Sequence, residues 1–118
     1  MRILAIDAAT VNTGFAVIDA NPGRIELTDW GKVVCKGDLD TRLGQLYQRI
    51  TDLVEKYEPD QVAVEDLKFN RGTPNLASMT KVAFAIGVVR AAFCNSGHED
   101  IVSITANSVR KTWEVGQK

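Results

Sequence analysis

Two acidic residues stand at the ends of apolar runs and are the first candidates for chemistry. Asp7 ends the run RILAID, and Glu65 ends the run QVAVE. Two carboxylates held close together repel each other unless a proton or a cation lies between them. Carboxylate oxygens are hard ligands that suit Mg²⁺ or Mn²⁺, and these cations also accept phosphate oxygens from a substrate. The chemistry this pair would support is metal-dependent phosphodiester hydrolysis, in which two metals activate water and stabilise the leaving oxygen.

Each acidic residue also has a simpler interpretation. Asp7 could cap the turn that follows its strand, because aspartate often bonds nearby backbone amides there. Glu65 could be an exposed carboxylate on an edge strand. Asp66 is a weaker candidate than Glu65, since consecutive residues of a regular strand point to opposite faces. Spacing alone leaves these alternatives open.

The elements that must position Asp7 begin with a predicted meander of three antiparallel strands. Strands are expected over residues 2–7, 14–19 and 24–36. The turn between the first two contains Asn12, Thr13 and Gly14, and the second turn reads Asn21-Pro22-Gly23.

Helical periodicity replaces the strand pattern from Asp40 onward. Apolar residues recur at spacings of three and four, and Pro59 prevents the helix from continuing. Asp40 or Thr41 is expected to cap its start. The series consists of Leu43, Leu46, Tyr47, Ile50, Leu53, Val54 and Tyr57.

A short strand over residues 61–65, a polar loop and a second helix are expected next. Thr73 is the expected cap, and Pro74 takes the first helical position. Gly97 is a natural stop for this helix. Its expected buried side consists of Leu76, Met79, Val82, Ala83, Ile86, Val89 and Phe93. A fifth strand over residues 101–105 and a third helix starting at residues 106–113 complete the chain.

The order of these elements predicts a mixed sheet. Alternating strands and helices after the third strand require parallel strands with right-handed crossovers. The first strand is expected to be central and to lie beside the strand that ends at Glu65. Asp7 and Glu65 would then lie near each other at the carboxyl ends of their strands, where open α/β sheets hold their sites.

Composition bounds the class of protein. The 118 residues suffice for one domain with a core. No apolar stretch approaching the roughly 20 residues of a membrane span is apparent, and no signal peptide, so a cytoplasmic location without membrane contact is expected. Cys35 and Cys94 have no metal-type spacing and are expected to be buried thiols.

Charge is distributed unevenly along the chain. Residues 1–66 carry 7 basic and 12 acidic side chains, whereas residues 67–118 carry 7 basic and 3 acidic ones. The basic excess of the second part suggests a surface that faces nucleic acid, although a solvated surface has the same composition.

Several features occur in an order typical of one family: an aspartate ending the first strand, a Thr-Gly pair, a glutamate ending the fourth strand and Gly87 in the next helix. They lie in the stretches ILAIDAATVNTGFAVID, TRLGQLYQRITDLVEKYEPD, QVAVEDLKF and ASMTKVAFAIGVVRAA. Through them the chain resembles, along essentially its whole length, the RuvC-type Holliday junction resolvases of bacteria and phages, which have an RNase H-like, retroviral integrase-like fold.

The resemblance implies a fold and a set of functional residues. The fold is α/β, an RNase H-like five-stranded mixed sheet flanked by helices. Asp7 and Glu65 match the first two metal-binding, catalytic carboxylates of the family. Phe69 matches an aromatic residue that wedges against bases at the crossover. The expected DNA-binding set is Lys68, Phe69, Asn70, Arg71, Arg110, Lys111 and Lys118.

Two departures from the family pattern qualify the expectation. Ala8 and Ala9 follow Asp7 where the family usually has Pro-Gly. The remaining two metal ligands of the family lie on a C-terminal helix, and the sequence ends at Lys118 before such a motif. We therefore expect residues 1–118 to be a single nuclease domain that is truncated at its C-terminus and lacks that helix.

The function implied is that of a crossover junction endodeoxyribonuclease, which uses Mg²⁺ or Mn²⁺, binds four-way or branched DNA and acts as a homodimer. A non-catalytic module that binds branched DNA is the alternative favoured by the missing acidic pair. An actin-like nucleotide-binding domain is a further alternative, but it needs a second domain for which there is no room here.

Overall fold

A five-stranded sheet is the frame of the molecule, and the computed structural model describes residues 1–67 and 76–104. Its strands lie in the order β3-β2-β1-β4-β5, so that β1 is central. Their bounds are Arg2–Asp7 for β1, Asn12–Asn21 for β2, Arg24–Val34 for β3, Gln61–Glu65 for β4 and Ile101–Ile104 for β5.

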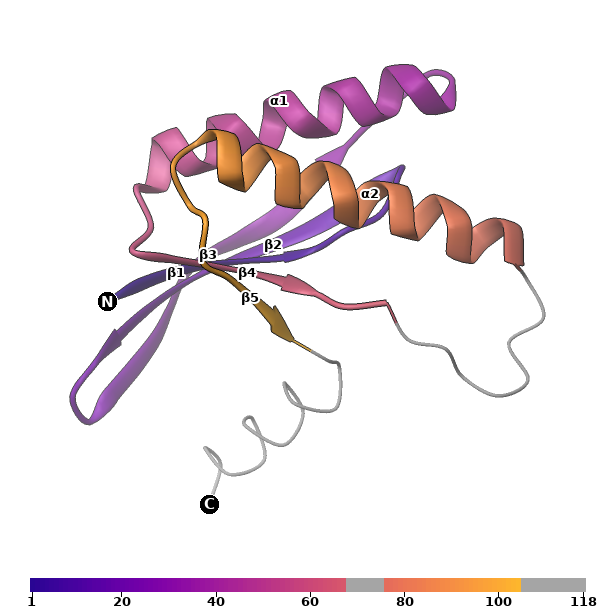
Figure 1. Ribbon diagram of the computed structural model, residues 1–118. Helices are drawn as coiled ribbons and strands as arrows, with labels where there is room; N and C mark the ends of the chain where they lie inside the picture. Colours follow the sequence, from indigo (N-terminus) through magenta and orange to yellow (C-terminus); the bar gives the residue numbers. More distant parts are fainter. Residues whose placement is uncertain (68–75, 105–118) are drawn as a thin grey trace.

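The strand directions make the sheet mixed, as the sequence predicts. β1 pairs antiparallel with β2 and parallel with β4, and β4 pairs parallel with β5. Both helices, α1 (Leu39–Tyr57) and α2 (Leu76–Asn95), lie on the same face of the sheet (Figure 1). The parallel β1-β4 pair follows from the crossover through α1.

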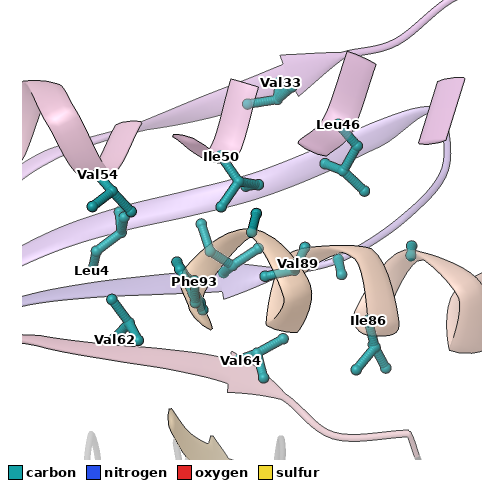
Figure 2. Packing of buried hydrophobic residues seen from close by; sticks show 14 of the residues in the cluster. Leu4, Val33, Leu46, Ile50, Val54, Val62, Val64, Ile86, Val89 and Phe93 are labelled. Atoms are coloured by element: carbon teal, nitrogen blue, oxygen red, sulfur yellow. The ribbon is translucent and has the colours of Figure 1, made fainter. Parts of the chain in front are cut away.

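The core lies between the sheet and the two helices. Leu4, Val62 and Val64 of the sheet point toward Ile50 of α1 and Phe93 of α2 (Figure 2). These five side chains are fully shielded from solvent. Alternate residues of β1 and β4 therefore face the helices, and the residues between them face the other side of the sheet.

The helix α1 begins and ends close to its predicted bounds, but its cap differs from the prediction. Asp38, and not Asp40 or Thr41, is the N-cap, and its carboxylate accepts a hydrogen bond of 2.8 Å from the Thr41 amide. The helix ends before Glu58, which adopts a left-handed backbone conformation with φ of 46°. Pro59 follows directly and excludes a further helical turn.

The turn between β1 and β2 lies earlier than predicted. β2 begins at Asn12, so Thr13 and Gly14 belong to the strand and residues 8–11 form the connection. The second turn is confirmed, since Asn21 pairs with Arg24 across Pro22 and Gly23. Gly23 has a positive φ of 77°, which residues with a Cβ rarely adopt.

The buried side predicted for α2 is only partly correct. Ile86, Val89 and Phe93 are buried, but Leu76 is 75% exposed and Ala83 is also exposed. Because α2 is apolar on nearly all sides, spacing could not select the face that packs. The first turn expected at Thr73 and Pro74, Thr105 at the end of the fifth strand and the third helix lie outside the described residues.

Two compositional expectations also need correction. Within the described residues, α2 is one helix that is long and apolar enough to cross a membrane by length and composition alone. Its residues Ala85, Ala92 and Phe93 are fully buried in the core beside α1 and the sheet. Cys35 is buried as expected, whereas Cys94 is exposed.

A polar network joins the N-terminal end of the sheet to the end of α1. Arg2 donates to the Asp19 carboxylate through Nε at 2.9 Å and to the Tyr57 carbonyl at 3.1 Å. The Thr28 hydroxyl also donates to Asp19. These hydrogen bonds from Arg2 and Thr28 lower the pKa of Asp19 from 3.8 to about 2.

The lowered pKa of Asp19 predicts a loss of stability in acid. A carboxyl group whose pKa is lower in the folded state stabilises the fold fully above its unfolded value and less as protons bind. The contribution of Asp19 should therefore be present above about pH 4 and disappear between about pH 4 and pH 2. Urea unfolding across this range measures it, and Asp19→Asn should remove this part of the pH dependence.

A matched substitution separates this effect from general acid denaturation. Asp52 lies on α1 and accepts a hydrogen bond from the neutral amide of Gln48. Asp52→Asn should leave the slope between pH 4 and pH 2 nearly as in the wild-type protein. Equal slopes in the Asp19→Asn and wild-type proteins would contradict the prediction.

Candidate active site

The carboxyl ends of β1 and β4 lie side by side and carry the two predicted acidic residues. Ile6 of β1 pairs in register with Val64 of β4, and Asp7 and Glu65 each follow by one residue. Both line one hollow of about 180 Å³. The structure thus confirms that these two residues are neighbours, while their role as metal ligands stays a prediction.

The hollow has an acidic rim and an apolar wall. Asp7 is exposed and Glu65 is half-buried. Ala8, Leu67 and the α2 residues Val82 and Ile86 form the apolar part of the lining. An apolar wall beside carboxylates reduces the screening of their charge by water, and this strengthens both their mutual repulsion and their attraction for a cation.

Asp66 also lines the hollow, although strand alternation made it the weaker candidate. Its amide donates to the Ile104 carbonyl at 2.7 Å, and its carboxylate accepts from the Leu67 amide at 3.1 Å. Asp66 lies just past the end of β4, where strict alternation no longer applies. Asp66 is therefore a neighbour of the site, and its lower rank as a metal ligand stays a prediction.

The donor set fits a divalent cation of the magnesium type. Mg²⁺ is commonly bound through one or two carboxylates, with waters and substrate phosphates in its other positions. Asp7 and Glu65 supply two such carboxylates. Within residues 1–67 and 76–104 there is no group of three or more His, Cys, Asp or Glu residues arranged to hold a metal.

A buried threonine forms hydrogen bonds with the backbone of the connection that follows Asp7. The Thr13 hydroxyl donates to the Ala9 carbonyl at 2.7 Å and accepts from the Ala9 amide at 3.1 Å. Thr13 is fully buried, so both backbone groups rely on this hydroxyl in place of water. The sequence predicts Thr13 in a turn, whereas Thr13 belongs to β2 and its hydroxyl bonds back to the connection that precedes this strand.

We expect Thr13→Val to destabilise the fold by about 1–3 kcal/mol, because valine keeps the shape and leaves the Ala9 amide and carbonyl unpaired. Urea unfolding measures the change. Thr13→Ser should restore most of the loss. Thr51→Val is the matched control, since the Thr51 hydroxyl bonds a carbonyl inside α1. A similar loss in both valine variants would contradict a specific role for Thr13.

The residues expected to contact DNA lie outside the part of the chain that the structure describes. They are Lys68, Phe69, Asn70, Arg71, Arg110, Lys111 and Lys118. The described geometry therefore brings together Asp7 and Glu65 alone from the set of predicted site residues.

Comparison with known proteins places this geometry in a family context. The model of the family described as crossover junction endodeoxyribonuclease RuvC matches residues 3–117. A protein of that description from Desulforamulus reducens is 37% identical over 98 residues, covering 81% of this chain and 58% of the relative. Another, from Syntrophomonas wolfei, is 35% identical over 91 residues, covering 75% of this chain and 51% of the relative.

The same fold occurs in solved structures. The structure of T. thermophilus RuvC in complex with a Holliday junction substrate superposes with a TM-score of 0.82 at 22% sequence identity, covering 95% of this chain and 69% of the other. This likeness confirms the fold predicted from the sequence. The chain spans between half and two thirds of the length of the curated relatives that it matches.

Proposed function

The chain belongs to the RuvC family of crossover junction endodeoxyribonucleases, and on this premise we propose that it is a metal-dependent endonuclease that resolves four-way or branched DNA junctions. The observation that carries the proposal is the pairing of Asp7 and Glu65 at the ends of adjacent parallel strands, around one hollow. The residues 1–118 act in this proposal as a single nuclease domain.

Asp7 and Glu65 would hold the cation, Mg²⁺ or Mn²⁺. When bound, such a cation polarises a phosphodiester and lowers the pKa of a bound water. By binding the same cation, the Asp7 and Glu65 side chains relieve the repulsion between their negative charges. They stand on rigid strands whose backbone is fixed by pairing on both sides of β1, and Thr13 fixes the connection after Asp7. A site held this way loses little energy to reorganisation during the reaction.

DNA contacts are proposed for the loop residues Lys68, Phe69, Asn70 and Arg71 and for the basic residues Arg110, Lys111 and Lys118. An apolar or aromatic side chain of the Phe69 type can unstack bases at a crossover. The basic residues would neutralise phosphates, so that added salt should weaken binding. The location consistent with such a function is the cytoplasm.

A homodimer is the proposed assembly, because two symmetric strand cuts require two sites related by a twofold axis. The outer side of α2 is the proposed interface. Phe84 on this side is 49% exposed, and a Cβ built on Gly87 would meet nothing within 4 Å. A second copy of α2 would cover these apolar positions. Sedimentation should give a dimer for the wild-type protein and a monomer for Phe84→Glu.

The proposed activity is tested with labelled DNA of two shapes. The protein as encoded is incubated with a four-way junction or with a linear duplex of the same sequence, in Mg²⁺ or in EDTA. We expect paired nicks in the junction with Mg²⁺ only, and little cutting of the duplex. Tight junction binding without cleavage at any metal concentration would favour the non-catalytic module instead. Equal cutting of both substrates would overturn structure selectivity.

A further inference from the structure

The sheet face turned away from the helices carries a row of residues that ends at Asp7. Lys32 of β3 pairs in register with Gly14 of β2, and Gly14 pairs with Asp7 of β1. Directly paired residues of antiparallel strands point to the same face. Leu4 and Ile6 are buried in the core under the helices, so strand alternation turns Asp7 and the rest of the row to the opposite face. Asp7 is the last residue of β1 and therefore also borders the hollow at the end of this strand.

The middle of this row is open. Gly14 has no side chain, and a Cβ built there would already lie 3.8 Å from the Asp7 Cβ. Two strand spacings separate the Lys32 and Asp7 backbones, which amounts to about 10 Å. That distance corresponds to about three nucleotides of rise along one DNA strand. A lysine at this place can therefore contact a phosphate close to the one that a cation at Asp7 would bind.

Lys32 is available for such a contact. Its side chain is exposed, and within the described ranges it forms no ion pair with a carboxylate. The acidic rim of the hollow repels the DNA backbone, and a nearby lysine offsets this repulsion. Lysine is well suited to the task, because its ammonium group donates to phosphate oxygens from several directions.

A large aromatic side chain lies next to Lys32 on the same face. Trp30 is two residues away on β3, pairs with Ala16 of β2 and is 67% exposed. Because Ala16 is small, it covers little of the indole ring. Aromatic rings beside cations are typical of surfaces that follow a nucleic-acid strand, because bases or sugars stack on the ring. Trp30 and Lys32 together form what we call the β3 strip.

We infer that the β3 strip is a DNA-binding subsite, in which Lys32 contacts a backbone phosphate near the scissile one and Trp30 packs against the adjoining nucleotide. The inference rests on the proposed function, since it takes Asp7 as the position of the scissile phosphate. It adds a contact on β3 to those proposed for residues 68–71 and 110–118.

Salt dependence of junction binding tests the contact of Lys32. Binding of a fluorescent four-way junction is measured by anisotropy at several NaCl concentrations without divalent metal. We expect Lys32→Gln to weaken binding about three- to tenfold, and to reduce the slope of log K against log salt by about 0.9, the value for one phosphate contact. With Mg²⁺, KM for the junction should rise while kcat changes little.

Arg24→Gln is the matched control. This substitution removes one positive charge from the same strand, as Lys32→Gln does. Arg24, however, lies at the opposite end of β3, about 26 Å from Lys32. It should leave the affinity, the salt slope and KM near their wild-type values. Equal effects of both substitutions, or an unchanged slope in Lys32→Gln, would overturn the inference.

Trp30 supplies an independent readout. Replacing Trp113, the second of the two tryptophans, with phenylalanine leaves Trp30 as the one fluorescent indole. Junction binding should quench its emission, and Trp30→Ala should weaken binding. Quenching of the Trp30 emission by an added protein, but not by junction DNA, would indicate a protein partner and overturn the inference. If the wild-type protein cleaves junctions, and Lys32→Gln and Trp30→Ala bind and cleave them with wild-type affinity and KM, the inference fails while the proposed function stands. If the wild-type protein binds no junction DNA, the proposed function fails as well.

Discussion

Replacing Asp7 with asparagine is expected to lower the rate of junction cleavage by about 10³-fold. Asparagine keeps the size of the side chain but loses the negative charge that a divalent cation requires. A metal ion supplies several kcal/mol of transition-state stabilisation, and each 1.36 kcal/mol corresponds to a factor of ten in rate. Because Asp7 is exposed at a strand end, its substitution should leave the core intact.

Single-turnover cleavage in Mg²⁺ measures this loss, and anisotropy with the labelled junction measures binding. Binding should be retained or slightly improved, since one negative charge near the DNA is removed. Glu65→Gln should behave in the same way, because both residues line the same hollow. A cleavage rate within tenfold of wild type for Asp7→Asn would contradict the assignment of this residue as a ligand.

Asp66→Asn is the comparison that sharpens the assignment. Asp66 lines the hollow as well, but its carboxylate is engaged by the Leu67 amide. We expect the cleavage rate to fall by less than about tenfold, because Asp66 would contribute only a nearby negative charge and would not itself bind the cation. Equal losses in Asp66→Asn and Glu65→Gln would place Asp66 among the metal ligands.

The second large effect is expected in the core, at Ile50. Ile50→Ala should reduce the free energy of unfolding by about 2–5 kcal/mol. Its side chain is fully buried on α1 and points toward the sheet and α2, so truncation leaves a cavity between three elements (Figure 2). A loss of this size is a large part of the stability of an ordinary domain.

Urea unfolding followed by circular dichroism measures the loss. The matched control is Ile25→Ala, the same substitution at a β3 position that is 76% exposed. It removes no buried contact and should cost less than about 1 kcal/mol, from strand propensity alone. Equal losses at Ile50 and Ile25 would show that the sheet-helix layer is not the stabilising core.

Strand positions followed from the sequence because their signals are local. The run ending at Asp7 and the run ending at Glu65 have the lengths and flanking residues of strands, and Pro22-Gly23 sets a tight turn. The sequence predicts the first turn too late in the chain, because Asn12-Thr13-Gly14 has the composition of a turn but belongs to β2 through its pairing with β3. Cross-strand pairing decided that boundary.

Helix boundaries and faces were predicted unequally. α1 has polar residues between its apolar ones, so the period identified Leu46, Ile50 and Val54 as buried. α2 lacks that contrast, and the same reasoning wrongly placed Leu76 and Ala83 in the core. A uniformly apolar helix carries no information about which side packs against its neighbours.

The sequence by itself determined the element types, the mixed sheet with a central first strand, and the two acidic strand ends as the candidate site, because each depends on local pattern and on general rules of chain topology. Only the tertiary structure decided the register of the strands. Register aligned Lys32, Gly14 and Asp7 in one row. Shifting a strand by one residue exchanges its faces, and this choice depends on contacts made across the whole sheet.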